Sequence, residues 1–182
     1  MKLPLDLVAR VTPAYAGRTV CVTGGAGFIG GHLVDALLSL LQSGPDGHED
    51  SVRVVVIDDL SNSTIDHLAE LIELEPDRLR FIHSSILDPV ALTEALHGVH
   101  TVFHLAAMGS VPASLADPAR SFAVNATGTV RVLEAARAAG VKRIVHSSSS
   151  SVYGESEGNP LAAKVESQRP QRCLVDSCAA RV

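Results

Sequence analysis

The stretch Thr23-Gly24-Gly25-Ala26-Gly27-Phe28-Ile29-Gly30 decides the fold of this chain. It follows a short apolar run over residues 19–22 and opens a segment in which apolar residues recur at helical spacing. The pattern predicts a strand, a tight glycine turn and a helix that stops at Gly44-Pro45. The residues expected on one face of that helix are Phe28, Leu33, Val34, Leu37, Leu38 and Leu41.

Three glycines of this stretch have distinct physical roles. Gly24 and Gly27 can adopt backbone angles closed to other residues and leave room for a phosphate group, while Gly30 lets the helix lie close to the strand. The helix N-terminus offers free N–H groups and a positive dipole end to an anion. Because Asp58 and Asp59 end the next strand, the pattern predicts a dinucleotide-binding site. The alternative is a glycine-rich turn in an unrelated α/β protein.

The composition limits the classes of function. The chain has 182 residues, enough for one domain with a sizeable core, and its net charge of −5 provides no basic surface for nucleic acid. No apolar run is long enough to cross a membrane, and residues 1–10 lack the pattern of a signal peptide. Cys21, Cys173 and Cys178 lack metal-ligand spacing, and Cys21 is expected to be a packed thiol. We expect a cytoplasmic protein without metal, nucleic-acid partner or membrane contact.

Five short apolar or β-branched runs predict five strands, at residues 19–22, 53–57, 79–83, 101–105 and 142–146. Segments with helical periodicity separate them. Strands that alternate with helices predict a doubly wound parallel sheet, the Rossmann fold, in three layers (αβα) with strand order 3-2-1-4-5.

Local signals place the ends of the predicted helices. Ser63 is expected to cap a helix over residues 64–74, with Asp66 in a capping-box position. Asp88-Pro89 opens the next helix, because proline is favoured in a first turn. A long helix over residues 119–139 is expected to end at Gly140. Its internal Gly128, at about 1 kcal/mol less favourable than Ala, predicts close packing on the sheet.

We expect three parts along the chain. Residues 1–17 form a leader, either a short helix around residues 3–10 packed on the domain or a loosely held terminus, and Pro13 is expected to break it. Residues 18–166 form the dinucleotide-binding domain. Residues 167–182 change character and have little periodicity, so we expect an irregular tail.

The spacing Gly-x-x-Gly-x-x-Gly at residues 24–30 resembles that of the extended short-chain dehydrogenase/reductase family, the NAD-dependent epimerases and dehydratases that include nucleotide-sugar epimerases. The resemblance covers roughly residues 19–164. Residues 109–118 are similar to the subgroup that epimerises UDP-N-acetylhexosamines such as UDP-N-acetylglucosamine. Further motifs that match the family are His104-Leu105-Ala106-Ala107, Asn125-Ala126-Thr127-Gly128-Thr129, and Ser147–Ser151 followed by Val152-Tyr153-Gly154.

The resemblance implies NAD as the cofactor and a nucleotide sugar as the substrate. Asp58 would accept hydrogen bonds from the adenosine ribose and repel a 2′-phosphate, which favours NAD over NADP. Ser149 would be the catalytic hydroxyl that orients the sugar C4 oxygen. The implied substrate residues are Gly109, Ser110, Ser149 and Ser150. The implied cofactor-binding residues are Gly24, Gly27, Phe28, Ile29, Gly30, Asp58, Asp59, Ser61, Asn62, Ser63, Ser85, Ile86, Leu105, Ala106, Ala107 and Asn125.

The chain departs from the family pattern where the chemistry is expected. The family removes the sugar hydroxyl proton with a Tyr, whose pKa is lowered by a Lys four residues later. The corresponding positions hold Cys173 and Ser177. Ser85 replaces a family Asp near the adenine, and Ala113 replaces an Arg in the substrate segment. We therefore expect a sheet truncated after about the fifth strand and no measurable epimerase activity.

Three interpretations follow from these departures. The chain is an active epimerase or dehydratase with an incomplete C-terminus, a non-catalytic NAD-binding module such as a sensor, or an assembly partner without catalysis. Residues 143–146 would end the sheet with unpaired backbone groups, and this run is short, apolar and β-prone. We expect self-association, for example as a homodimer, or dependence on another partner.

Overall fold

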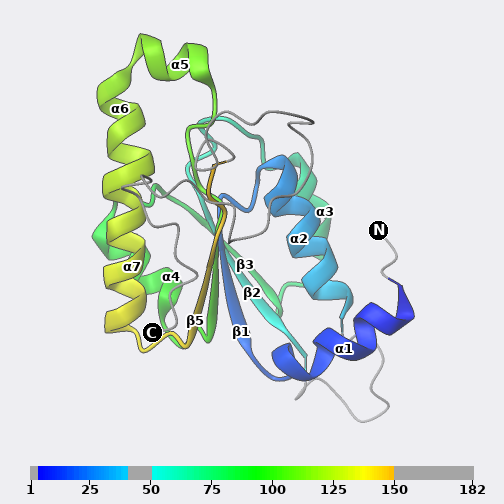
Figure 1. Ribbon diagram of the computed structural model, residues 1–182. Coiled ribbons are helices and arrows are strands. Elements are labelled where there is room, and N and C mark those ends of the chain that lie inside the picture. The colour runs from blue at the N-terminus through cyan, green and yellow to red at the C-terminus, as the bar shows by residue number, and fades with distance from the viewer. Residues whose placement is uncertain (1–3, 41–50, 150–182) are drawn as a thin grey trace, which may run out of the picture.

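The computed structural model describes residues 4–40 and 51–149 and contains a five-stranded parallel sheet (Figure 1). The strand order is β3-β2-β1-β4-β5, which confirms the predicted doubly wound fold. Val22 of β1 lies opposite Val56 of β2 and Phe103 of β4. Each strand differs from its predicted bounds by at most one residue at an end. The strands are β1 (Thr19–Thr23), β2 (Arg53–Asp58), β3 (Leu79–His83), β4 (Thr101–His104) and β5 (Arg143–His146).

Helices cover both faces of this sheet (Figure 1). One face carries α1 (Leu5–Tyr15), α2 (Phe28–Ser39) and α3 (Asp66–Leu74). The other carries α4 (Pro89–Leu96) and α7 (Thr129–Ala138). Three short helical segments precede α7: α5 (Val111–Ala116), α6 (Pro118–Phe122) and the π-helical turn η2 (Ala123–Gly128).

The sheet separates two apolar cores. Successive residues of a strand point to opposite faces, so Val20 and Val22 join one core while Cys21 joins the other. Strands buried on both faces need continuous apolar runs, which the β-branched sequence of β2 provides. Leu38 and Leu68 fill the first core beside α2 and α3. Loops, rather than core side chains, lie at the carboxyl ends of the strands.

One prediction about α2 falls outside the described residues, and another is wrong. The helix ends at Ser39, whereas Gly44-Pro45 and Leu41 lie outside the described residues. Phe28 is 77% exposed and does not join the buried face. As the first residue of α2, it lies at an end of the helix, and its ring contacts that of His32, with centroids 4.7 Å apart, instead of the core.

The predicted cap of α3 is also wrong. The helix begins at Asp66, and no side chain caps its N-terminus. Ser63 lies two residues before the N-cap position, which Ile65 occupies, and its hydroxyl donates to the Asp58 carboxylate at 3.2 Å. The Thr64 hydroxyl donates to Asp66 at 2.7 Å. By contrast, the predicted start of α4 is confirmed, since Asp88 accepts the N–H groups of residues 90 and 91.

The predicted long helix over residues 119–139 is a helical segment interrupted by the π turn η2. It ends near Gly140, whose φ of +73° matches the expected terminating glycine. Close packing at Gly128 is confirmed, but its partner is a side chain of the loop after β3. A Cβ on Gly128 would lie 2.6 Å from Ile86 Cδ1.

The leader contains a longer helix than predicted. α1 includes Pro13, which was expected to break it. Proline removes one backbone hydrogen bond, yet Val8, Val11 and Tyr15 pack against the core beneath α2, which offsets that loss. The Tyr15 ring lies 6.3 Å from that of Phe103. The predicted boundary at residue 166 and the predicted tail lie outside the described residues.

Candidate functional site

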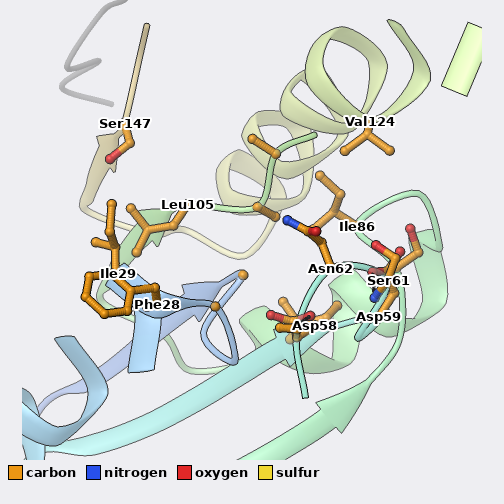
Figure 2. A pocket seen from close by; sticks show the side chains of 18 of the residues that line it. Phe28, Ile29, Asp58, Asp59, Ser61, Asn62, Ile86, Leu105, Val124 and Ser147 are labelled. Carbon is orange, nitrogen blue, oxygen red and sulfur yellow. Dashed lines mark hydrogen bonds between the residues drawn. The ribbon is translucent and has the colours of Figure 1, made fainter. Parts of the chain in front are cut away.

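A cavity of about 290 Å³ opens at the carboxyl ends of β1, β2 and β4 (Figure 2). Phe28 and Ile29 lie on one side of it, and Asp58 and Asn62 lie toward the other. The cavity brings together all the predicted cofactor residues except Asn125. Its lining consists of Gly24, Gly27, Phe28, Ile29, Gly30, Ile57, Asp58, Asp59, Ser61, Asn62, Ser63, Ser84, Ser85, Ile86, Leu105, Ala106, Ala107, Val124 and Ser147.

The turn has no room for a Cβ at Gly24 or Gly30, whereas Gly27, for which a backbone angle closed to other residues was expected, has an ordinary φ of −72°. Gly24 has a φ of +71°, and a Cβ built on it would lie 2.7 Å from the backbone nitrogen of Ala106. A Cβ on Gly30 would clash with the carbonyl oxygen of Gly24, and one on Gly27 would lie 3.3 Å from the same oxygen. The absent side chains therefore leave bare backbone facing the cavity.

The N-terminus of α2 points into this space. Gly27 is its N-cap, and no side chain accepts its first N–H groups. The first N–H groups of a helix have no partner within the helix, and the helix dipole adds positive potential there. This end of the cavity therefore fits an anion such as a diphosphate.

Asp58 connects the two loops that border the cavity. Asp58 is only 9% exposed. Oδ2 accepts the N–H of Ala26 in the glycine turn at 3.0 Å. Oδ1 accepts the N–H of Leu60 at 2.9 Å and the hydroxyl of Ser63 at 3.2 Å. The carboxylate thus holds the glycine turn and the loop after β2 in a fixed relation.

Two buried titratable groups lie below the cavity. Burial raises the pKa of the Cys21 thiol to about 12, so the thiolate is inaccessible near neutral pH, and the predicted packed thiol is confirmed. Burial, and secondarily the nearby His146, lower the pKa of His104 to about 4. His104 is 2% exposed and is therefore neutral at pH 7.

Several predicted site residues lie away from this lining. Asn125 is committed to the backbone of Met108, with bonds of 2.8 and 3.1 Å. Ser110 caps α5 by accepting the N–H of Ala113 at 3.3 Å. Gly109 and Ser149 are described but do not line the cavity. The predicted positions Ser150, Cys173 and Ser177 lie outside the described residues.

Four lining residues were not predicted from the sequence, although each had a weak signal. Ser84 and Val124 each stand next to a predicted residue, Ser85 and Asn125. Ile57 is the last apolar residue before the acidic pair, and Ser147 is the first residue after β5. Proximity to a strand's carboxyl end was the shared signal in these last two cases.

Residues 4–40 and 51–149 contain neither a metal-binding cluster nor a membrane-spanning helix. No cluster of three or more histidine, cysteine or acidic side chains has a geometry that could hold a metal ion there. Among the helices of the same residues, none is both long and apolar enough to pass through a bilayer.

Comparison with known proteins gives consistent matches. Residues 20–173 match the NAD dependent epimerase/dehydratase family. A UDP-glucose 4-epimerase from Mycolicibacterium smegmatis is 44% identical over 146 residues, which are 78% of this chain and 42% of that enzyme. The chain thus spans less than half the length of this relative.

Two solved structures resemble the fold. One is a UDP-N-acetylglucosamine 4-epimerase from Methanobrevibacter ruminantium in complex with UDP-N-acetylmuramic acid, with a TM-score of 0.66 and 35% identity, over 85% of this chain and 44% of that one. The other is the Thermus thermophilus UDP-glucose 4-epimerase complex with NAD, with a TM-score of 0.66 and 30% identity, over 84% of this chain and 44% of that one. With the family match over residues 20–173, the glycine turn and the parallel sheet, the chain belongs to the NAD-dependent epimerase/dehydratase family.

Proposed function

We propose that the cavity binds NAD and that the chain is the cofactor-binding part of a nucleotide-sugar epimerase or dehydratase. The observation that carries this proposal is the bond from Ala26 N–H to Asp58, which sets a ribose acceptor beside an uncapped helix N-terminus. A dinucleotide needs both features at one edge of a parallel sheet. Bound NAD would act as the hydride acceptor.

The remaining acceptor capacity of Asp58 supports NAD over NADP. Oδ1 already accepts two hydrogen bonds and Oδ2 accepts one, so Oδ2 has capacity left for a ribose hydroxyl. A 2′-phosphate would instead meet the negative charges of Asp58 and Asp59, both of which line the cavity. Among described lining residues there is no Arg or Lys to offset that repulsion.

Titration of the purified 182-residue chain with NAD tests the proposal. We expect saturable binding with one NAD per chain, measured by calorimetry. Heat that does not saturate would refute the proposed function, because the cavity would then lack its cofactor.

The proposed substrate of the whole protein is a UDP-sugar, oxidised reversibly at C4 by NAD. Two of the relatives support this proposal, since one is a UDP-glucose 4-epimerase and the other a UDP-N-acetylglucosamine 4-epimerase. Gly109, Ser110, Ser149 and Ser150 remain the residues proposed to face the sugar. Ser149 would position the reacting hydroxyl.

For the 182-residue chain itself we propose NAD binding without turnover. Cys173 and Ser177 occupy the positions where the resemblance places the base and the Lys that lowers its pKa. A coupled assay on UDP-glucose and UDP-N-acetylglucosamine, with the M. smegmatis relative as positive control, should show no activity. Turnover that depends on Ser149 would favour an active epimerase, and loss of NAD binding would favour an assembly partner.

The buried thiol of Cys21 places no demand on an oxidising compartment, and we propose that the protein works in the cytoplasm. Fractionation of the source cells would test this directly.

A further inference from the structure

The loop over residues 105–108 forms part of the cavity lining and is held at both of its ends. At one end, the N–H groups of Leu105 and Ala106 donate to Thr23 Oγ1, each at 3.2 Å. At the other, Asn125 Oδ1 accepts the Met108 N–H at 2.8 Å, and Asn125 Nδ2 donates to the Met108 carbonyl at 3.1 Å. The two anchors come from β1 and from the π turn η2, which are far apart in the sequence.

A single side chain joins these two anchors. His104 Nδ1 lies 2.7 Å from Thr23 Oγ1, and His104 Nε2 lies 3.0 Å from Thr129 Oγ1. The Thr129 hydroxyl in turn donates to the Asn125 carbonyl at 2.8 Å. The hydrogen bonds therefore close a ring from Thr23 through His104, Thr129 and Asn125 to the loop, and back to Thr23.

The hydrogen-bond donors in this ring determine the histidine tautomer. Thr129 uses its only hydroxyl hydrogen on Asn125, so Thr129 Oγ1 must accept from His104 Nε2–H. Thr23 Oγ1 accepts two amides and retains one hydrogen, which it donates to a bare His104 Nδ1. Neutral His104 with its proton on Nε2 is the state that satisfies every group of the ring.

We propose that His104, in this Nε2–H form, is a positioning residue that links the glycine turn to the π turn. Through this link it fixes the position of the backbone of residues 105–108 against the cofactor. This inference rests on the proposed binding of NAD. The backbone of this loop touches the turn directly, since the space beside Gly24 is closed by Ala106. A small displacement of the loop would therefore narrow or tilt the cavity. π turns occur frequently at functional sites, which agrees with this placement.

A purely structural role makes a different prediction. His104 also stacks on His146, with ring centroids 5.0 Å apart, and this contact alone could explain why a histidine is buried here. If packing is the only role of His104, then removing the Thr129 hydroxyl from the ring of hydrogen bonds would leave the His104 tautomer and the affinity for NAD unchanged.

Thr129→Val removes the acceptor of His104 Nε2–H and keeps the shape of the side chain. We expect NAD affinity to fall about 3- to 10-fold, the size of one net hydrogen bond. Thr129→Ser should restore it. The matched control is Thr93→Val, because Thr93 makes the same bond to the carbonyl four residues earlier, at 2.8 Å, on α4 away from the cavity.

Substitutions at His104 separate the two arms. His104→Asn retains an acceptor near Thr23 and loses the donor to Thr129, whereas His104→Gln retains the donor and loses the acceptor. Both should weaken NAD binding while circular dichroism shows a folded chain. Nitrogen-15 NMR of the unliganded wild-type chain should show His104 protonated at Nε2 only, and Thr129→Val should alter that signal.

The outcomes separate this inference from the proposed function. If wild-type chain fails to bind NAD, the proposed function fails. If wild-type binds NAD and Thr129→Val binds it equally well, or if His104 is protonated at Nδ1, the positioning role is overturned.

Discussion

The Asp58 carboxylate accepts the backbone N–H of Ala26 at 3.0 Å across the gap between β2 and the glycine turn. The bond links the end of one strand to the turn that follows the neighbouring strand. Because the same carboxylate also holds Leu60 and Ser63, its removal should disturb both loops as well as the contact to a ribose. Asp58 is therefore both a proposed ligand of the cofactor and a brace for the site.

Asp58→Ala should weaken NAD binding more than any other single substitution in β2 and the loop that follows it. We expect a loss of at least about tenfold, since a charged hydrogen bond contributes roughly 1.5–3 kcal/mol. Asp59→Ala should have a smaller effect, because the Asp59 carboxylate makes a local bond, accepting the Ser61 N–H at 3.0 Å. Asp77→Asn, on an exposed residue before β3, is the control. Equal losses at Asp58 and Asp59 in calorimetric titrations would contradict this assignment.

Gly30→Ala should destabilise the fold and abolish NAD binding. A Cβ at this position would clash with the Gly24 carbonyl oxygen and lie 2.7 Å from Gly25 Cα, and both partners are backbone. We expect a loss of at least about 1–3 kcal/mol in the free energy of unfolding, as for overpacked cores.

The neighbouring Gly31→Ala is a matched control in the same helix. Its Cβ would meet only ordinary contacts, 3.6 Å from His67 Cβ and 3.7 Å from the Gly25 carbonyl oxygen. Helix propensity should leave this variant unchanged or stabilise it by up to about 1 kcal/mol. Urea unfolding that ranks Gly31→Ala below Gly30→Ala would contradict the packing argument.

The depressed pKa of His104 predicts a pH dependence of stability. Burial and then His146 lower it from 6.5 to about 4, so the unfolded chain takes up this proton at higher pH than the folded chain. The associated stability is fully present above about pH 6.5 and is lost as the pH falls through about 4. Integrated over this window, it amounts to roughly 3 kcal/mol.

Unfolding measured between pH 4 and 6.5 tests that contribution. The slope of stability against pH reports the number of protons taken up on unfolding. In His104→Asn this number should be smaller by about one than in wild type, whatever the absolute stability of the variant. NMR titration of His104 in the folded wild type is the direct check. Equal slopes in wild type and His104→Asn, together with a His104 pKa near 6.5 in the folded chain, would show that burial does not lower the pKa of His104.

The edge strand β5 predicts self-association. In the part of the chain that the structure describes, β5 pairs with β4 alone, and Val145 on it is 39% exposed. We expect association in light scattering, a low melting temperature, and a rise in that temperature with NAD by mass action. Val145→Lys should reduce association by placing a charge on the edge. A monomer whose high melting temperature is unaffected by NAD would contradict both expectations.

Much of the fold follows from short-range patterns. Residues 54–57 form a continuous apolar run and Leu79, Phe81 and Ile82 supply the apolar residues of 79–83, so β3 is predicted at its observed bounds and β2 within one residue. The N-cap at Asp88 is equally local, because its bonds reach only two and three residues along the chain. Such features depend on residues that are close in the sequence, so local sequence patterns predict them well.

Features that depend on distant partners were not predicted. The helix α3 begins at Asp66 rather than after Ser63, whose hydroxyl bonds to Asp58, and Pro13 remains helical because α1 packs on the core. The π turn leaves no trace in apolar spacing. The ring through Thr23, His104 and Thr129 joins residues up to 106 positions apart by polar contacts, which hydrophobic patterning does not encode.

The most direct test of the account is a paired calorimetric titration of the wild-type chain with NAD and with NADP. We expect saturable binding of one NAD per chain and clearly weaker binding of NADP, because Asp58 and Asp59 border the space where a 2′-phosphate would lie. NADP binding equal to or tighter than NAD binding, or no saturation with either dinucleotide, would contradict it.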